Sequence, residues 1–495
     1  MTPLAVAIIA ILYFSVLFLI SFLTGKDSSD DAFFVGNKKS PWYLVAFGMI
    51  GASLSGITFI SVPGAVGGAK FGYMQMVLGY LLGYFIIATV LLPIYYKLNL
   101  TSIYTYLEKR LGVYAYKTGA AFFLLSRIIG AALRLYLVAA VLQLAIFNAW
   151  GVPFAATVAI TILLIWLYTF RSGIRTIVFT DSLQTFFMLL ALVLTIFALM
   201  SQLNFGLGDM WAAVNNSEYS KIFFWELKPP NNFVKQFLSG AFIAIVMTGL
   251  DQDMMQKNLS CRSLPDAKKN MFWFSIILMI VNFVFLILGA LMFIYMDQIG
   301  IDIPTRLVNG EAKAATDLIF PNLALNHTNF FVGAVFFIGL LAAAYSSADS
   351  ALTALTTSFC IDFLGFQKGK SNKKTRYIVH IGFSVVLFIV ILIYNQLAND
   401  ALIWDVFKAA MFTYGPILGL FAFGILTKRK VKDNALVILV CILALFAAYH
   451  INKVSGANLN GFEFGFLILP LNGFLTFIGL YLISVKDKTI GTIIE

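Results

Sequence analysis

Polar oxygen atoms cluster inside one of the most apolar stretches of this sequence. Within the apolar run 328–360, residues 346–350 read Ser-Ser-Ala-Asp-Ser. On an α-helix Ser346 and Ser350 lie about one turn apart, and Asp349 lies beside them. Hydroxyls and a carboxylate are good ligands for a hard cation, and Na+ is the natural candidate. The alternative is that the serines bond back to their own helix while Asp349 forms a structural ion pair.

A second carboxylate, Asp181, lies near the start of the apolar run 177–201. It has two interpretations: it caps the beginning of that helix, or it adds a charged oxygen to a cation site. Asp349 leaves three roles open, because a buried carboxylate can bind Na+, carry a proton or pair with a buried arginine.

The run 42–66 combines hydroxyls with residues that weaken a helix. Gly51, Gly56, Pro63 and Gly64 disturb its backbone. Irregular backbone at membrane depth is tolerated where it lines protein or a cavity. We therefore expect a cavity here, the alternative being close packing of small residues. The hydroxyls that would face the cavity belong to Ser53, Ser55 and Thr58.

Two arginines occur in the apolar run 118–146. Arg127 and Arg134 are seven residues apart, which is almost two helical turns, so they share one face. Three roles are open for them: binding of an anionic solute, pairing with Asp349 or Asp181, or stabilisation of the fold.

The composition places these residues in a membrane. Soluble proteins carry about 25% charged residues, whereas this chain of 495 residues has 12% charged and 60% hydrophobic residues. Its mean hydropathy is +0.90. The net charge of +11 is spread over short loops, not gathered in a patch, which excludes nucleic acid as a partner. The sequence predicts an all-α integral membrane protein that contacts lipid.

Motifs for enzyme chemistry are missing from the sequence. No catalytic triad, phosphate loop or metal-binding spacing occurs, and the three cysteines lie far apart. We therefore expect no enzyme activity and no obligate protein partner. The expected ligand is a small solute.

About thirteen apolar runs are long enough to cross a bilayer, for which a helix needs about 20 residues. The first of them lacks the basic start and the cleavage site of a signal peptide, so we interpret it as a retained helix. The runs are 3–23, 42–66, 71–95, 118–146, 152–170, 177–201, 233–250, 271–296, 328–360, 377–395, 401–426, 434–451 and 460–484.

Lysines and arginines alternate between the loops in a regular way. The loops of one side hold about 24 of them and those of the other about seven, with Lys257 counted in the first group and Lys235 in the second. Basic loops stay cytoplasmic. The sequence thus predicts a multi-pass protein of the cell membrane with its N-terminus outside and its C-terminus in the cytoplasm.

Several short segments, taken together and in this order, resemble the sodium/solute symporter family. They are Ser55–Phe59, Leu100–Glu108, Val178–Gln184, Asp251–Lys257 and Ser346–Ser350. The resemblance implies a leucine-transporter-like fold of two inverted five-helix repeats in a single transporter domain. The first repeat would span 42–201 and the second 233–426, with one extra helix at 3–23 and two at 434–484. The broken helices would be those at 42–66 and 233–250, with the binding sites at their breaks.

The resemblance also implies ion sites. The main Na+ site would use the backbone carbonyls of Gly51, Leu54 and Ala343 and the hydroxyls of Ser346 and Ser347. A second Na+ site, present in some members, would add further residues. These are Asp181, Ser350 and Asp349, with Ser346 shared; position 349 usually carries a hydroxyl in relatives.

Length and helix count are most similar to the bacterial sialic acid transporters of that family. Such relatives have an arginine where this chain has Gly130, between Arg127 and Arg134, and a glutamine where it has Gly79. One turn before Gly79 lies Gln75, which we include among the candidate solute ligands.

The predicted function is Na+-coupled import of a small polar organic solute by alternating access, for example a sugar or a sugar acid such as sialic acid. The alternatives are a proton-coupled symporter, a symporter of monocarboxylates or amino acids, a channel, and a membrane sensor that binds solute without moving it.

Overall fold

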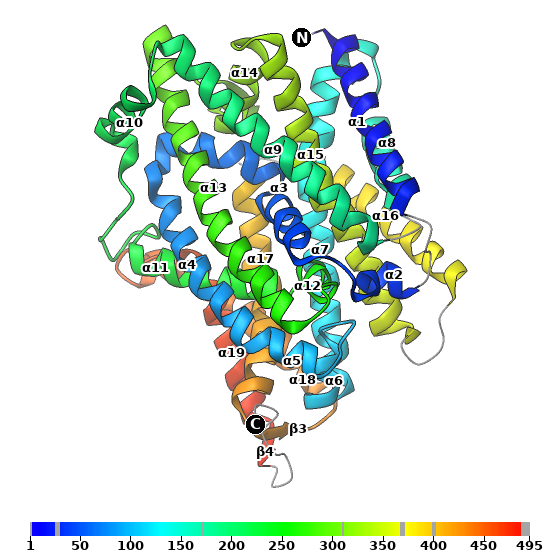
Figure 1. The fold of residues 1–495 in the computed structure, drawn as a ribbon. Helices are drawn as coiled ribbons and strands as arrows, with labels where there is room; N and C mark the ends of the chain where they lie inside the picture. The colour runs from blue at the N-terminus through cyan, green and yellow to red at the C-terminus, as the bar shows by residue number, and fades with distance from the viewer. Residues whose placement is uncertain are drawn as a thin grey trace.

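The computed structural model describes residues 2–24, 30–169, 173–308, 311–366, 372–397 and 402–486. The described chain forms a bundle of helices with two small antiparallel hairpins (Figure 1). The long helices are α1 (Pro3–Thr24), α3 (Trp42–Ala69), α7 (Val113–Leu142), α8 (Phe154–Thr169), α9 (Ile174–Leu203), α13 (Leu264–Ile299), α15 (Phe330–Ser358), α16 (Lys373–Leu397), α17 (Leu402–Leu426), α18 (Leu436–Asn458) and α19 (Ile468–Leu482).

Shorter elements connect or extend these helices. The helices are α2 (Asp30–Val35), α4 (Tyr73–Ile86), α5 (Leu92–Lys97), α6 (Thr105–Leu111), α10 (Leu207–Asn216), α11 (Phe233–Ala244), α12 (Gln252–Leu259) and α14 (Ile319–Asn326). The strands pair as β1 (Thr305–Val308) with β2 (Glu311–Ala314), and as β3 (Arg429–Val431) with β4 (Ser484–Lys486).

The helices lie where the hydropathy of the sequence predicts them. In the described residues, ten helices are long and apolar enough to cross a membrane, or eleven when the bent pair α11–α12 is included. The predicted number of about thirteen is higher because α8 and the first half of α3 are shorter apolar helices. The second half of α3 and α4–α5 also form one continuous candidate span, Thr58–Lys97.

The amount of burial separates central helices from peripheral ones. In α15, 78% of the most apolar stretch is buried inside the protein, against 22% in α16 and in α18. The small side chains of α15, mostly alanine and serine, allow its neighbours to pack closely around it. The exposed side chains of α16 and α18 are large and apolar, such as Ile378 and Phe446. These outer helices present a surface suited to lipid.

Both predicted broken helices are present. In α3 the backbone leaves the helical conformation at Ser55, where φ is 41° and ψ is 164°. In the second, α11 continues through a π-helical turn, Ile245–Gly249, and then bends by 64° into α12. The two breaks are the positions at which backbone groups become available for ligands.

The ends of the bundle differ in their connections. Figure 1 shows the start of α1 at the same end as α10 and α14, whereas α6, β3 and β4 lie at the opposite end. Several basic residues of the predicted cytoplasmic loops, such as Arg171 and Lys368, lie outside the described residues.

Two basic residues assigned to loops are in fact buried. Lys257 lies in α12 and is 1% exposed, and Lys235 lies in α11 and is 5% exposed. Lys235 donates hydrogen bonds to the carbonyls of Lys228 (3.0 Å) and Glu463 (2.6 Å). Counting them as loop charges was wrong. Lys257 belongs to the polar helix α12, into which the second broken helix extends and which is itself buried, and Lys235 belongs to the first turn of α11.

Candidate functional site

A close approach between α3 and α9 sets the geometry around the first break. A side chain on Gly51 would place its Cβ 2.3 Å from Thr185 Oγ1, and one on Gly48 would place it 2.9 Å from Asp181 Cβ. Only glycine allows the two helices to meet here. The backbone N–H of Gly51 donates to Thr185 Oγ1 (3.1 Å), which fixes the contact.

The predicted main-site residues are buried and come from two adjacent helices, α3 and α15. Ser347 Oγ donates to the carbonyl of Ala52 (3.3 Å) and to that of Ala343 (3.4 Å), so it joins the helices next to the break. Gly51 and Leu54 lie on the same turn of α3 as Ala52. The positive φ of Ser55 ends the regular helical hydrogen bonding that would otherwise occupy the carbonyls of this turn.

Ser346 points to a different partner. Its hydroxyl donates to Asp181 Oδ1 (2.7 Å) across the contact between α15 and α9. A hydroxyl that donates its hydrogen keeps its lone pairs available, so Ser346 can bind a cation while it holds Asp181.

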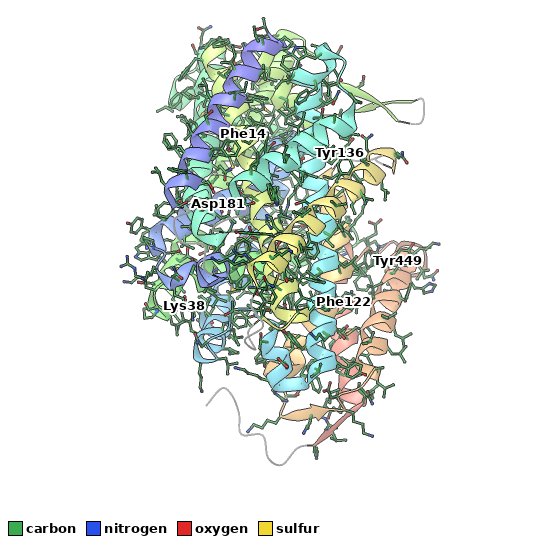
Figure 2. All side chains as sticks on the ribbon, turned by 90° about the vertical axis from the view of Figure 1, so that its right-hand side faces the viewer. Phe14, Lys38, Phe122, Tyr136, Asp181 and Tyr449 are labelled. Carbon is green, nitrogen blue, oxygen red and sulfur yellow. The ribbon has the colours of Figure 1, made fainter. Side chains whose placement is uncertain are left out.

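Asp181 is the centre of a buried polar network. Lys257 Nζ of α12 lies 2.7 Å from Asp181 Oδ2, and both side chains are almost completely buried. The interpretation of Asp181 as a helix cap is wrong, because α9 begins at Ile174, about two turns earlier. Figure 2 shows Asp181 between the two ends of the molecule, near α1.

The N-terminal helix reaches this network. With the Gln184 amide oriented to satisfy its neighbours, its oxygen accepts from Tyr13 Oη (3.0 Å) and its nitrogen donates to Asp181 Oδ1 (3.2 Å). The ring of Phe14 packs edge to face on Tyr345 of α15, with ring centroids 4.8 Å apart. The predicted extra helix is therefore attached to the same carboxylate as Lys257.

The two other residues of the predicted second site are on α15. Ser350 Oγ donates to the carbonyl of Ser346 (2.9 Å), which is the back-bonded arrangement named as an alternative. Asp349 is fully buried and lies within electrostatic range of Tyr13.

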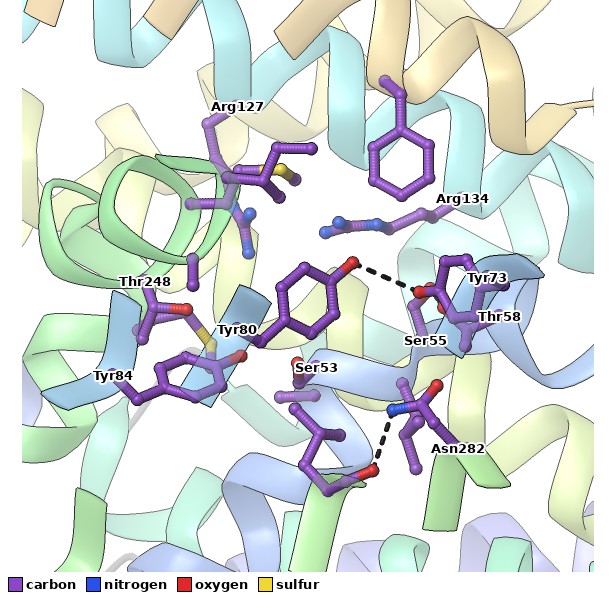
Figure 3. A pocket seen from close by; sticks show the side chains of 18 residues that line it. Ser53, Ser55, Thr58, Tyr73, Tyr80, Tyr84, Arg127, Arg134, Thr248 and Asn282 are labelled. Carbon is purple, nitrogen blue, oxygen red and sulfur yellow. Dashed lines mark hydrogen bonds between the residues drawn. The ribbon is translucent and has the colours of Figure 1, made fainter. Parts of the chain in front are cut away.

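A cavity of about 90 Å3 lies between the two broken helices. Five predicted solute ligands line it: Ser53, Ser55, Thr58, Arg127 and Arg134. Figure 3 shows the two guanidinium groups directed into the space around the Tyr80 ring, whose hydroxyl lies 3.2 Å from that of Tyr73. The other lining residues are Ala52, Leu54, Tyr84, Ile243, Ala244, Met247, Thr248, Met254, Leu278, Asn282 and Phe407.

The two arginines have different environments. Arg127 forms an ion pair with Asp253, and its Nη1 lies 3.6 Å from Asp251 Oδ2, both residues being at the start of α12. The sequence left open a pairing of Arg127 with Asp181 or Asp349. In the structure its partners are Asp251 and Asp253 instead. Arg134 is 8% exposed and forms no ion pair with any of the described residues.

Gln75 does not line this cavity. Its amide nitrogen donates to the carbonyls of Gly72 (3.2 Å) and Asn231 (3.0 Å), and its oxygen accepts from the Phe224 N–H (3.1 Å). Gln75 therefore fixes the segment before α11 and borders a second cavity of about 380 Å3. Gly79 faces α11, where a Cβ would lie 2.0 Å from the Phe237 carbonyl oxygen, so no larger residue fits there.

Several residues of the site were not identified from the sequence. The cavity residues Tyr80 and Phe407 lie in apolar runs that also contain many other aromatic groups, and Asn282 is a single amide within the apolar run 271–296. Tyr73 and Phe407 line both cavities and so separate them. For Lys257 the sequence did contain a signal, because this residue belongs to the Asp251–Lys257 segment that carries the family resemblance.

Comparison with known protein families gives a match over most of the chain. The family described as "Sodium:solute symporter family" matches residues 33–441. The chain belongs to the sodium:solute symporter family. It is therefore a sodium-coupled solute symporter, a multi-pass membrane transporter and not an enzyme, with Na+ as the coupling ion.

Individual relatives differ in their solutes. The chain is 25% identical over 475 residues to the sodium/sialic acid symporter NanT of Aliivibrio fischeri, covering 92% of this chain and 89% of that protein. It is also 25% identical over 423 residues to sodium-coupled monocarboxylate transporter 1 of Xenopus laevis, covering 82% of this chain and 64% of that protein.

A solved structure shows the same fold. A sodium-coupled sialic acid symporter in a substrate-bound outward-open state superposes with a TM-score of 0.79 at 20% identity, covering 97% of this chain and 99% of that one. The fold is the leucine-transporter-like fold, as the family resemblance implied.

Proposed function

We propose that this symporter imports a hydroxylated carboxylate, and that Arg134 binds the carboxylate group. The observation that carries the proposal is a buried guanidinium that lines the cavity and has no ion pair among the described residues. A buried charge without a direct ion pair is costly, and an anionic solute would supply that direct partner. Arg127 is a weaker candidate because two carboxylates already neutralise it.

Uncharged groups in the cavity suit a solute with hydroxyls. Asn282 Nδ2 donates to the Leu278 carbonyl (2.8 Å), whereas its buried Oδ1 accepts no hydrogen bond from the part of the chain that the structure describes. Ser53 and Thr58 add hydroxyls from either side of the break, and Tyr80 adds an aromatic face. A solute hydroxyl that donates to Asn282 Oδ1 would satisfy this acceptor.

The relatives named for sialic acid support a sugar acid as the solute, since sialic acid carries both a carboxylate and several hydroxyls. A second candidate is a short hydroxy-monocarboxylate. It is favoured by the cavity volume of about 90 Å3, which is small beside the roughly 300–1,000 Å3 of pockets for larger ligands. Relatives named as monocarboxylate transporters support it as well.

For the coupling ion we propose the site at the break of α3. Its ligands would be the carbonyls of Gly51, Leu54 and Ala343 and the hydroxyls of Ser346 and Ser347. The hydrogen bonds of Ser347 to the carbonyls of Ala52 and Ala343 support this, because they bring a hydroxyl to these two backbone segments. A cation held there would link α3 to α15 and so favour one of the two access states, provided that its affinity differs between them.

We also propose the predicted topology: N-terminus outside, C-terminus cytoplasmic, repeats at 42–201 and 233–426, and extra helices at 3–23 and 434–484. Figure 1 supports it, because α10 and α14 lie at the end of the bundle where α1 begins, and α6, β3 and β4 lie at the opposite end. The bends in α3 and in α11–α12 support it too, because they lie at corresponding places in the two proposed repeats.

The test is a thermal-shift screen of the purified protein in NaCl or choline chloride. The probes are N-acetylneuraminate, gluconate, lactate, pyruvate and the neutral polyol mannitol. We expect at least one hydroxylated carboxylate to raise the melting temperature in NaCl, since a ligand of the native state stabilises it. Arg134→Gln should weaken that ligand about 10- to 150-fold, because a hydrogen bond to a charged group contributes about 1.5–3 kcal/mol.

The matched control is Arg262→Gln, which makes the same change at an exposed arginine. It should leave the shift unaltered. The proposal fails if the best ligand is the neutral polyol, or if Arg134→Gln binds the carboxylate as tightly as the parent does.

A further inference from the structure

We propose that Lys257 is a tethered cation that takes the place of a second Na+ at Asp181, so that each transport cycle uses a single Na+. The proposal rests on the sodium coupling of the family and on the main Na+ site proposed above. It departs from the second-site assignment made from sequence, in which Asp181 is itself a Na+ ligand.

The geometry places the ammonium where that ion would be bound. Lys257 Nζ lies 2.7 Å from Asp181 Oδ2, while Ser346 Oγ lies 2.7 Å from Oδ1 of the same carboxylate. Both carboxylate oxygens are therefore engaged.

The charges at Asp181 oppose the binding of a second ion by this carboxylate. Lys257 already neutralises Asp181, and a Na+ bound beside the ammonium would be repelled by it in a site of low polarity. The side chains of Asp181 and Lys257 are only 1% and 2% exposed, so water cannot screen the repulsion between the two cations.

The position of Lys257 gives the pairing a mechanical role. Lys257 belongs to α12, the second half of a broken helix, while Asp181 belongs to the continuous helix α9. A Na+ at Asp181 would be released into the cytoplasm and replaced in every cycle. The ammonium instead stays attached to the chain, so it can hold α12 against α9 without carrying charge across the membrane.

The Asp181 carboxylate is also held from the side of α1. Gln184 donates to its Oδ1 (3.2 Å) and accepts from Tyr13 Oη (3.0 Å). This second set of contacts keeps the carboxylate directed at Lys257, and it explains how α1 can belong to the same functional unit as α12.

The experiment counts Na+ ions without any solute. Purified protein is titrated with 22Na+ at constant ionic strength, with choline as the replacement cation, and bound ions are measured per protein molecule. The parent should bind one Na+. Lys257→Gln, which removes the charge and keeps a similar length, should bind a second Na+, and Lys257→Gln combined with Asp181→Asn should return to one.

A parent that binds two Na+ ions, one of which is lost in Asp181→Asn, overturns the proposal even if Lys257→Gln does not fold. It is equally overturned if a folded Lys257→Gln protein binds no additional ion. Failure of the main site is distinguishable: Ser347→Ala should remove or weaken the parent's ion, while the increment between the parent and Lys257→Gln stays. Failure of the solute assignment does not affect the count, because no solute is present.

Discussion

Two arginines on the same face of α7 should respond in opposite ways to the same substitution. Arg127→Gln removes the charge that pairs with Asp253 and lies near Asp251 at the start of α12. Asp251 keeps other partners, since its carboxylate accepts from the N–H groups of Asp253 (2.9 Å) and Met254 (3.3 Å) and from the Tyr414 hydroxyl. Asp253 depends on Arg127, because its carboxylate oxygens accept no other hydrogen bond from the described residues.

The expected cost follows from this difference. Removing one partner of a buried ion pair destabilises a protein by about 3–5 kcal/mol, because the other charge is left without compensation. Arg127→Gln should therefore lower the melting temperature of the solubilised protein substantially, and the added change Asp253→Asn should restore most of the loss. Arg134→Gln should leave the melting temperature unchanged or raise it, because it removes a buried charge that has no ion-pair partner among the described residues.

The assay is size-exclusion chromatography of detergent-solubilised protein after heating, done without added solute so that ligand binding does not contribute. If Arg134→Gln destabilises the protein as much as Arg127→Gln does, then Arg134 is structural and its proposed role in the cavity is wrong. If Asp253→Asn gives no recovery in the Arg127→Gln background, the stranded carboxylate is not the cause of the loss.

Three further predictions concern the cation site and its support. Ser347→Ala should raise the Na+ concentration for half-maximal uptake, because one proposed ligand is lost; an unaltered Na+ dependence contradicts this. Asp349→Ser should weaken Na+ binding severalfold without changing the number of ions, since it removes a buried negative charge within one turn of Ser346; loss of an ion from the 22Na+ count would instead make Asp349 a direct ligand. Gly51→Ala should destabilise the protein because its Cβ would lie 2.3 Å from Thr185 Oγ1. Thr185→Gly should partly rescue it in a heating assay, and no rescue would show that the contact is not the cause.

Hydropathy and small-residue patterns predicted the framework well. Each expected apolar run corresponds to a helix, and the glycines and hydroxyls of 42–66 correctly indicated a break, which falls at Ser55. The residues Ser53 and Thr58 of α3 and Arg134 of α7 line one cavity, and their role as solute ligands stays a prediction. Periodicity along a single helix accounts for the shared face of Arg127 and Arg134.

Partners between distant helices were not predictable in the same way. Gln75 was chosen by its distance along the chain from Gly79, but the contacts of that amide are made by the segment 224–231, which no periodicity relates to α4. Lys257 was assigned to a loop because its surroundings in the sequence are polar. A hydropathy window cannot separate a polar loop from a polar half-helix that is buried by α9 and α15.

The contacts of α15 connect these separate observations into one account of coupling. Ser347 of α15 bonds the first broken helix at Ala52, and Thr357, nearly three turns further on, accepts from Gln256 (3.0 Å) of α12, the end of the second. Between them Ser346 holds Asp181, which in turn holds Lys257 of α12. A Na+ that takes up the lone pairs of Ser346 and Ser347 therefore acts on both broken helices at once. Release of this Na+ would weaken the contact between α15 and α3 and would disturb Asp181, which binds Lys257 of α12. The two broken helices beside the cavity would then lose their fixed positions together. Coupling of solute to Na+ then needs no direct contact between them, only that both favour the same arrangement of α3, α12 and α15.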